Sequence, residues 1–302
     1  MRRVLAALAA FAMLASGYLV YLGRTDRELP WSSGNEPTVS SDDSRPLPAD
    51  TSAAMQFEIS CPPEAELACA EADGVGESTF TVEGVDVTEA NLGAKRDKAP
   101  DLWLTTALGF ERVRYVRPDL RLVETVASSK VVVVTRTGTA TPALACAAKL
   151  GCLTTAGRVA FPQLDRGDSL WISTSAIGTN VTGKSLDEIA GAAPRIEGLR
   201  LARRPRVVEA FSGLVSVRLY DAVVTTESSV KSVSPTGVDV AAADAPPVVY
   251  VLLASSNVGD ADGKKVAASL RVSLANNGYS AATASTELPD PGLANEINER
   301  LR

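Results

Sequence analysis

Short apolar blocks alternate with polar ones along the chain after residue 55, and their lengths predict strands and helices in turn. The blocks FEIS at 57–60, STFTVEGVDV at 78–87 and DLWLTT at 101–106 have the length and alternation of strands. The intervening EAELACAEA at 64–72 and TEANLGAKRDKA at 88–99 are typical of helices. This β-α-β-α-β order predicts a parallel sheet with crossover helices.

Two later runs are apolar almost throughout and predict strands that are buried on both faces. They are VVVVTR at 131–136 and VVYVLLAS at 248–255. Between them we expect helices at 142–151 and 185–193 and strands at 157–162 and 219–227. After the second run, 264–276 carries its apolar residues on one helical face and ends at the stop signal Asn277-Gly278. The expected fold class is therefore α/β.

The amino-terminal block Val4–Leu22 contains no charged residue, and a helix of this length spans about 28 Å, the thickness of a hydrocarbon core. Arg2 and Arg3 precede it, so we expect the amino terminus inside and the body outside. We therefore interpret 1–23 as a transmembrane signal-anchor that holds an extracytoplasmic body at the cell membrane in a single pass. A cleaved signal peptide is the alternative, because small residues end the stretch 14–17, although the apolar run continues beyond them.

Composition and charge narrow the function further. Residues 24–55 are rich in Ser, Pro and Asp without apolar periodicity, which predicts a disordered linker. The chain of 302 residues has a formal net charge of -6, which gives no broad attraction for nucleic acid. It contains no His, which excludes Ser-His-Asp and Cys-His catalysis and His-ligated metals. We accordingly expect no enzymatic activity, no cofactor, no metal and no nucleic-acid partner.

Four cysteines fall into two local pairs, Cys61 with Cys69 and Cys146 with Cys152. Outside the cytoplasm an even number at short spacing favours disulfides. We favour the two local pairings, because each would join a loop to the end of a short helix, while crosswise bonds and buried thiols stay open. A zinc site is poorly supported, because neither pair has the two-residue spacing and no His is present.

Four segments, taken in order, resemble the extracytoplasmic solute-binding proteins of ABC importers, of the two-lobed type 2 class that includes molybdate, sulfate and sugar binders. They are APDLWLTT at 99–106, ASSKVVVV at 127–134, LYDAVVTTESSV at 219–230 and GKKVAASLRVSLANNGY at 263–279. They are similar, respectively, to the family's strand with its ligand loop, a strand that crosses between lobes, a second-lobe strand and a late helix that ends in Gly-aromatic. The ordered set carries the resemblance.

The resemblance implies a periplasmic-binding-protein-like body of two α/β lobes around a cleft that closes by hinge motion. Lobe one would comprise 56–133 plus 247–302, and lobe two 134–246. The ligand contacts that carry over by position are all hydroxyls: Ser60, Thr105, Thr106, Ser128, Ser129, Ser169 and Ser173. Trp171 is the aromatic residue that we expect in the cleft. Hydroxyls and the N–H groups of helix starts bind an oxyanion or a sugar without a compensating cation.

The function that this resemblance implies is the capture of a small solute, an oxyanion or a sugar, for an ABC importer whose permease would be the protein partner. Two departures stand out, since a transmembrane helix replaces the family's usual lipid anchor and no aromatic platform for a sugar is identifiable. A diverged envelope interaction or sensor protein that keeps the fold without binding solute is therefore the alternative.

One motif supports a different function. The stretch GTNVTGKS at 178–185 matches the phosphate-binding loop pattern in full, in which Lys184 would reach the terminal phosphate and Ser185 would hold magnesium. The outside location and the lack of an apolar strand ending in Asp count against nucleotide binding. We keep it as a lesser alternative to a surface turn of lobe two.

Overall fold

The computed structural model describes residues 57–72, 79–82, 100–178, 181, 183–282 and 288–301, all within one compact unit, Thr51–Arg302. The predicted signal-anchor 1–23, the linker 24–55 and the helix at 88–99 lie outside the described residues. Within the described part of the chain, every helix is too short or too polar to cross a bilayer.

The first sheet has the strand order β2-β1-β3-β9-β4. Its members are β1 (Glu58–Cys61), β2 (Thr79–Val82), β3 (Leu102–Thr106), β4 (Arg121–Ser129) and β9 (Val248–Ala254). β1 is parallel to both β2 and β3, as the β-α-β pattern predicts, whereas β9 is antiparallel to β3 and β4. The helical elements of this half are the 3-10 turn η1 (Pro63–Ala65), α2 (Glu66–Glu71), α4 (Ala107–Val113) and α11 (Asp260–Asn276). We call this half lobe one.

The second sheet has the order β6-β7-β5-β8, and we call it and its helices lobe two. Its strands are β5 (Val131–Arg136), β6 (Val159–Ala160), β7 (Ala222–Thr226) and β8 (Val238–Ala242). The helical elements between them are α5 (Pro142–Ala145), α6 (Leu150–Leu153), α7 (Gly167–Ile177), η2 (Leu186–Glu188), α8 (Ala192–Leu201), α9 (Val207–Val215) and α10 (Glu227–Val233). The last helix, α12 (Pro291–Leu301), contacts α4 of lobe one and α7 and α8 of lobe two.

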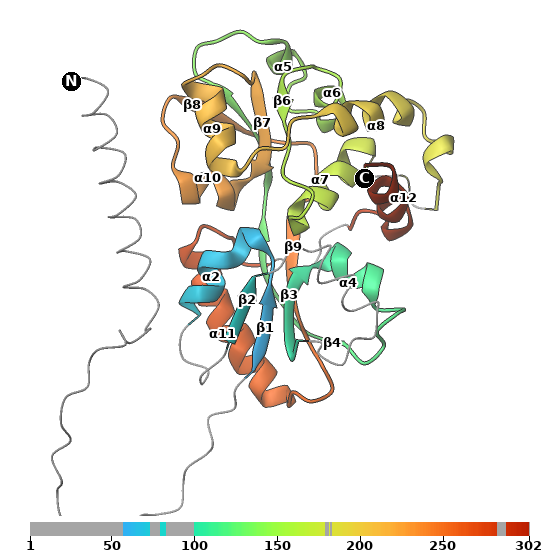
Figure 1. Cartoon of the computed structure of the whole chain (residues 1–302), viewed down its shortest axis with the longest axis vertical. Coiled ribbons are helices and arrows are strands. Elements are labelled where there is room, and N and C mark those ends of the chain that lie inside the picture. The colour runs from blue at the N-terminus through green and yellow to red at the C-terminus, as the bar shows by residue number, and fades with distance from the viewer. Residues whose placement is uncertain are drawn as a thin grey trace, which may run out of the picture. The chain divides into compact units, whose positions relative to one another are not determined.

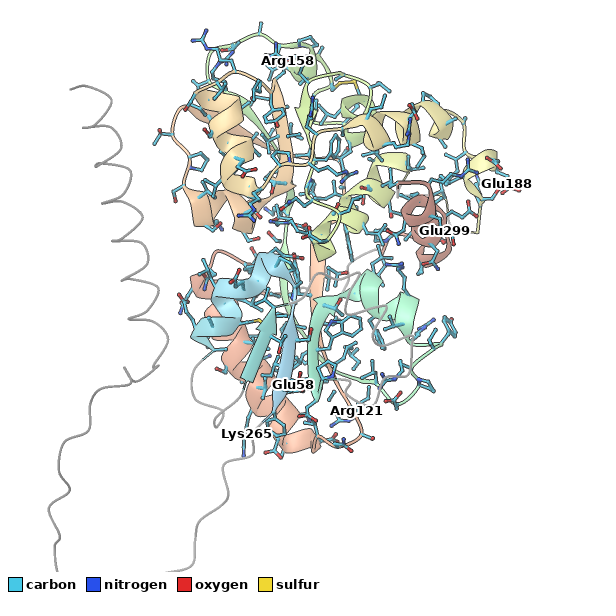
Figure 2. All side chains as sticks on the ribbon, viewed as in Figure 1. Glu58, Arg121, Arg158, Glu188, Lys265 and Glu299 are labelled. Carbon is cyan, nitrogen blue, oxygen red and sulfur yellow. A yellow bond between two sulfur atoms is a disulfide. The ribbon has the colours of Figure 1, made fainter. Side chains whose placement is uncertain are left out.

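Among the described residues, the chain crosses between the two sheets at two places, and Figure 1 shows both crossings. The first lies at Lys130, between β4 and β5, and the second lies at 243–247, between β8 and β9. All seven residues of β9 are buried, and so are the first five residues of β5, as the two apolar runs predict. Glu58 and Lys265 lie on lobe one, and Arg158 and Glu188 lie on lobe two (Figure 2).

Several predicted elements have different bounds in the structure. The predicted helix at 185–193 is only the turn η2, because Gly191 adopts a left-handed φ of 77° and α8 begins after it. The predicted helix at 142–151 is split into α5 and α6, because Ala147 and Ala148 have positive φ angles. Helix α7 has no counterpart among the predicted elements. Its residues are buried on nearly every side, so it lacks the polar face that marks a helix in a sequence.

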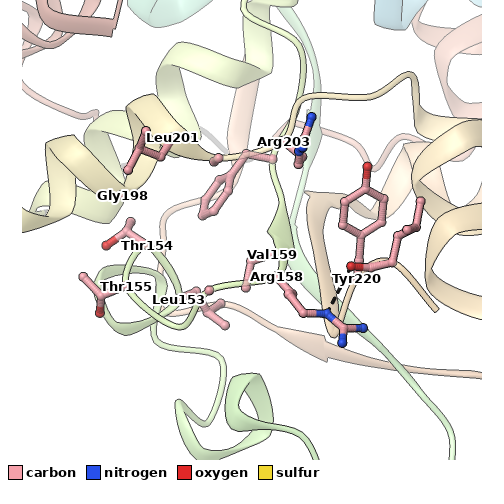
Figure 3. A pocket seen from close by; sticks show the side chains of 13 residues that line it. Leu153, Thr154, Thr155, Arg158, Val159, Gly198, Leu201, Arg203 and Tyr220 are labelled. Carbon is pink, nitrogen blue, oxygen red and sulfur yellow. Dashed lines mark hydrogen bonds between the residues drawn. The ribbon is translucent and has the colours of Figure 1, made fainter.

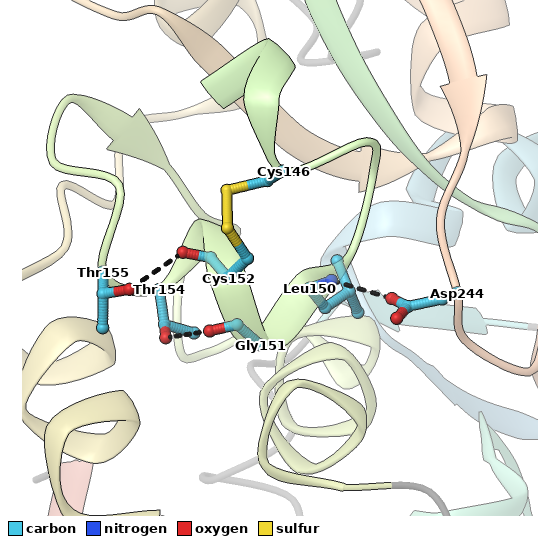
Figure 4. The surroundings of a disulfide bond; sticks show 7 residues. All are labelled: Cys146, Leu150, Gly151, Cys152, Thr154, Thr155 and Asp244. Atoms are coloured by element: carbon cyan, nitrogen blue, oxygen red, sulfur yellow. Dashed lines mark hydrogen bonds between the residues drawn. A yellow bond between two sulfur atoms is a disulfide. The ribbon is translucent and has the colours of Figure 1, made fainter. Parts of the chain in front are cut away.

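Both local disulfide pairings are confirmed. Cys61, the last residue of β1, is bonded to Cys69 in α2, and Cys146 is bonded to Cys152 in α6. Around the second bond, the backbone N–H of Leu150 donates to Asp244 at 2.7 Å (Figure 4). Asp244 lies on the return from β8 to β9, so this contact joins the disulfide segment to a crossing between lobes.

Candidate functional site

The two lobes meet at the carboxylate of Glu64, which lies in η1 directly after β1. Its two oxygens accept hydrogen bonds from the backbone N–H groups of Gly167, at 3.3 Å, and Asp168, at 3.1 Å. These two residues open helix α7 of lobe two, and the N-cap residue Arg166 makes no side-chain cap there. A carboxylate suits this place, because the N–H groups of a first helical turn are unsatisfied and carry positive partial charge. A side chain of lobe one therefore caps a helix of lobe two.

An arginine and an aspartate complete the charged cluster. The guanidinium of Arg166 donates to both carboxylate oxygens of Asp168, at 3.0 and 2.6 Å, and to the hydroxyl of Ser229 at 2.9 Å. Asp168 is fully buried and Arg166 is only 9% exposed. Burial, and after it the negative charge of Asp168, raise the pKa of Glu64 to about 7. The cluster thus contains two carboxyl groups and one guanidinium. Because Arg166 bonds Asp168 directly, a negative charge on Glu64 is only partly balanced.

Two tyrosines hold Glu64 from the side of lobe one. The hydroxyl of Tyr279 donates to the backbone oxygen of Glu64 at 2.7 Å, and that of Tyr250 lies 3.4 Å from its carboxylate. Their rings meet edge to face with centroids 5.3 Å apart. Burial raises the pKa of both phenols, so both are hydrogen-bond donors over the physiological range. Tyr279 is the aromatic residue at the end of the fourth segment on which the resemblance rests.

A chain of hydroxyl groups runs from the first crossing into lobe two. The Ser129 hydroxyl donates to the Ser228 hydroxyl at 3.0 Å and accepts from the Ser228 backbone N–H at 3.0 Å. The Thr226 hydroxyl lies 3.1 Å from that of Ser228 and 3.0 Å from that of Ser229. Ser229 in turn contacts Arg166, so the hydroxyl chain ends at the charged cluster.

A cavity of about 200 Å³ lies beside this cluster and is lined by both lobes. Its polar lining residues are Glu64, Glu66, Asn277 and Tyr279 from lobe one and Arg166, Ser228, Ser229 and Ser232 from lobe two. Pro63 and apolar residues of α2, α9 and α10 complete the wall. The volume is below the roughly 300 Å³ at which pockets for drug-sized molecules begin. It suits a solute of only a few heavy atoms.

Of the eight residues predicted to contact a ligand, only Ser129 belongs to the hydroxyl chain, and none lines this cavity. Thr106 caps α4 by accepting from Gly109 at 3.1 Å, and the Ser128 hydroxyl donates to the Ala281 carbonyl. Ser60 is buried at the end of β1. The hydroxyls of Thr105 and Ser173 are buried without a hydrogen-bond partner among the described residues. Their role in ligand binding stays a prediction.

The other two predicted residues belong to α7. Trp171 is completely buried, and its indole N–H donates to the Pro246 carbonyl at 3.2 Å, which ties α7 to the second crossing. The Ser169 hydroxyl donates to the Pro162 carbonyl and accepts from Arg204. Both residues therefore support the position of the helix that Glu64 caps.

Sequence reasoning missed the residues that form the cluster. Glu64 is part of a predicted helix, and no local pattern shows that it caps another helix more than a hundred residues later. Ser228 and Ser229 follow the predicted strand at 219–227, and their position just after that strand is the one signal that could have identified them.

The loop at 178–185 lacks the context of a phosphate-binding loop. Such a loop follows a strand and opens a helix, whereas here α7 precedes it and the three-residue turn η2 follows. Ser185 caps η2 together with Glu188, and the Gly183 N–H donates to Asp290 at 2.9 Å. These contacts are those of a surface turn.

Comparison with known proteins identifies the fold. No protein-family model and no curated protein matches the sequence. Among solved structures, the ferric binding protein from Campylobacter jejuni is 9% identical with a TM-score of 0.56, over 81% of this chain and 96% of that one. The Trichodesmium protein IdiA (FutA), in complex with iron and citrate, is 8% identical with a TM-score of 0.54, over 82% and 97%.

A regulatory protein matches as well. An H2O2-bound mutant of OxyR from Corynebacterium glutamicum is 12% identical with a TM-score of 0.51, over 76% of this chain and 68% of that one. Solute-binding proteins and OxyR regulatory domains share the two-lobed type 2 fold, and the body of this protein has that fold. At these sequence identities the similarity establishes the fold, and the activity has to be argued from the residues of the site.

Proposed function

We propose that this protein is a membrane-anchored, extracytoplasmic solute-binding protein that captures a small solute between its two lobes and catalyses no reaction. The observation that carries the proposal is the cavity of about 200 Å³ at the lobe interface, lined by Glu64 and Tyr279 from one lobe and by Arg166, Ser228 and Ser229 from the other. A solute there would contact both lobes and would stabilise their closed arrangement.

The lining favours a small oxyanion or a sugar. The cavity offers hydrogen-bond donors to the oxygen atoms of a solute, whether these are anionic or neutral. The donors are the guanidinium of Arg166 and the hydroxyls of Ser228 and Ser229. An oxyanion would take the N–H groups of Gly167 and Asp168 once Glu64 withdraws, whereas a sugar hydroxyl could donate to Glu64 where it lies. Delivery to an importer would require a permease as the partner.

A thermal-unfolding panel tests this function on the full chain, purified in a nonionic detergent under oxidising conditions. The panel comprises oxyanions, sugars, amino acids, polyamines and magnesium-ATP. A solute that binds the native state raises the unfolding temperature by mass action. We expect one solute class to raise it, and Ser229→Ala to reduce the shift. A rise with magnesium-ATP alone that Lys184→Ala abolishes would contradict the proposal.

The second candidate function is a retained fold that binds no solute and acts through an envelope partner. The observation that favours it is Glu64 itself, because its carboxylate already occupies the N–H groups that an anionic solute would use. The two candidates differ in Glu64→Ala. If the Glu64 carboxylate only blocks these N–H groups, an oxyanion should raise the unfolding temperature of the variant and not that of the wild type. If the protein has no solute site, no solute should raise the unfolding temperature of either form.

A further inference from the structure

Lobe two contains a larger pocket that the proposed function does not use. It has a volume of about 740 Å³, and every residue that lines it belongs to lobe two (Figure 3). It lies between α6 and α8 on one side and the end of the segment 217–220 on the other, next to the edge strand β6. This volume is within the range of roughly 300–1,000 Å³ that pockets for small molecules have.

The pocket is mainly apolar. Leu153, Val159 and Phe161 line it and are each less than 5% exposed, and Tyr220 also belongs to the lining. Two leucines line it while lying largely in solvent, Leu201 at 68% and Leu219 at 57% exposure. The apolar part of a ligand in this pocket would cover exposed apolar surface of both leucines and remove it from water.

The charge around the pocket is positive. Its charged lining residues are Arg158 and Arg203, and no Asp or Glu lines it. The guanidinium of Arg158 already has partners within the protein, because it donates to the carbonyls of Leu219 and Arg218 and lies 3.4 Å from Asp221. The Arg203 side chain is exposed and makes no hydrogen bond or ion pair within the described part of the chain. Arg203 is therefore the cation that is available to a ligand.

The walls of the pocket are fixed before any ligand arrives. The disulfide Cys146–Cys152 holds α6, whose last residue Leu153 and C-cap residue Thr154 line the pocket. Helix α8 packs directly on that segment at Gly198, where a Cβ atom would clash with the Thr154 carbonyl oxygen. Across the pocket, the bonds of Arg158 brace the backbone at 218–219. Binding to such a preformed pocket costs little ordering of the protein.

We propose that this lobe-two pocket binds a small apolar acid, with its hydrocarbon part between Phe161 and Leu219 and its carboxylate on the guanidinium of Arg203. An acid is favoured over an amine because the charged lining residues are both arginines. The site is separate from the cavity between the lobes, so it would act as a second ligand site of the same body.

Calorimetric titration of the full chain with 4-phenylbutyrate tests the site, with 4-phenylbutylamine as the cationic analogue. We expect saturable binding of the acid to one site and at least about tenfold weaker binding of the amine. Arg203→Glu should weaken binding of the acid at least about tenfold. Arg200→Glu is the matched control, because Arg200 lies three residues before Arg203, near the end of α8, pairs with Glu197 and does not line the pocket. Its effect should stay within about twofold.

The side-chain change at Arg203 leaves its backbone contact with Phe161 in place, so the variant should fold, which circular dichroism checks. Three results would overturn the proposal: no saturable binding of 4-phenylbutyrate, equal binding of the amine, or the same loss in both arginine variants. The panel for the cavity between the lobes is independent, since Ser229→Ala should leave the affinity for 4-phenylbutyrate unchanged.

Discussion

The backbone N–H of Asp168, in the first turn of α7, donates a hydrogen bond of 3.1 Å to the carboxylate of Glu64 in the turn that follows β1. The two residues belong to different lobes, so this contact breaks whenever the lobes separate. The same residue lines the cavity where we propose that a solute binds. Opening of the lobes and access to the solute site are therefore coupled through Glu64.

The first prediction concerns the pH dependence of stability. The pKa of Glu64 is about 7 in the folded protein, above its ordinary value of 4.5, because of burial and the charge of Asp168. Between these values the folded state holds the proton more tightly than the unfolded chain, so this contribution to stability is present below pH 4.5 and is lost as pH rises to 7. Urea unfolding at pH 5 and 8 should show that the wild type loses about 2 kcal/mol more than Glu64→Gln. Equal losses in the two proteins would contradict the assignment.

The second prediction concerns the hydroxyl chain. Ser129→Ala removes the acceptor of the buried Ser228 N–H and should lower the free energy of unfolding by about 2 kcal/mol. Ser232→Ala is the control, because Ser232 is an exposed residue whose hydroxyl donates to the Ser229 carbonyl of its own helix. This variant should cost less than about 0.5 kcal/mol. Denaturant unfolding of both variants measures the difference, and similar costs would argue against a structural role for Ser129.

The third prediction compares two glycines. A Cβ atom on Gly198 would collide with the backbone carbonyl of Thr154, whereas one on Gly213 would meet the Tyr220 ring at 2.5 Å. A side-chain ring can rotate away and a backbone carbonyl in a disulfide-held segment cannot. Gly198→Ala should therefore cost about 3 kcal/mol of stability and Gly213→Ala about 1 kcal/mol. The opposite order in thermal or urea unfolding would show that α6 and α8 pack less tightly than described.

The fourth prediction concerns the second disulfide. Replacing both Cys146 and Cys152 by Ser opens a short loop and should lower stability by roughly 2 kcal/mol. It should also weaken binding of 4-phenylbutyrate, because α6 forms one wall of the lobe-two pocket. Titration and urea unfolding of the double variant measure the two effects. The matched replacement of Cys61 and Cys69 should lower stability while leaving that affinity unchanged, and a loss of affinity there would contradict the link to α6.

Seven of the strands that the structure describes could be predicted, because each lies in a short run with its own apolar signature. Strands β4 and β8 have no counterpart among the predicted strands, and four of the five residues of β8 are exposed. β5 and β9 are apolar almost throughout, and β1, β2 and β3 overlap the short apolar blocks at 57–60, 78–87 and 101–106. The disulfides followed from spacing and compartment. Helix α7 could not be predicted, since its serines and threonines are buried like its apolar residues. Part of this burial comes from contacts with other segments, such as that of Ser169 with Arg204.

The site was harder to predict than the fold for a physical reason. Glu64, Arg166, Ser228 and Tyr279 are separated by about fifty to a hundred residues, and only the closing of the two lobes brings them together. Five of the seven predicted hydroxyls lie at strand ends, whereas Ser169 and Ser173 lie in α7. Thr106 caps a helix and Ser128 links two segments. A strand end shows where polar groups gather, but not which of them face the other lobe.

The distance between the lobes tests the central claim most directly. Spin labels at Lys265 on lobe one and Val217 on lobe two, both exposed, report this distance by electron–electron double resonance. For a protein that captures solute by closure, we expect two distances in the free wild type and a shift toward the shorter one with the solute class that raises the unfolding temperature. A single distance, unchanged by every solute in both the wild type and Glu64→Ala, would contradict capture between the lobes.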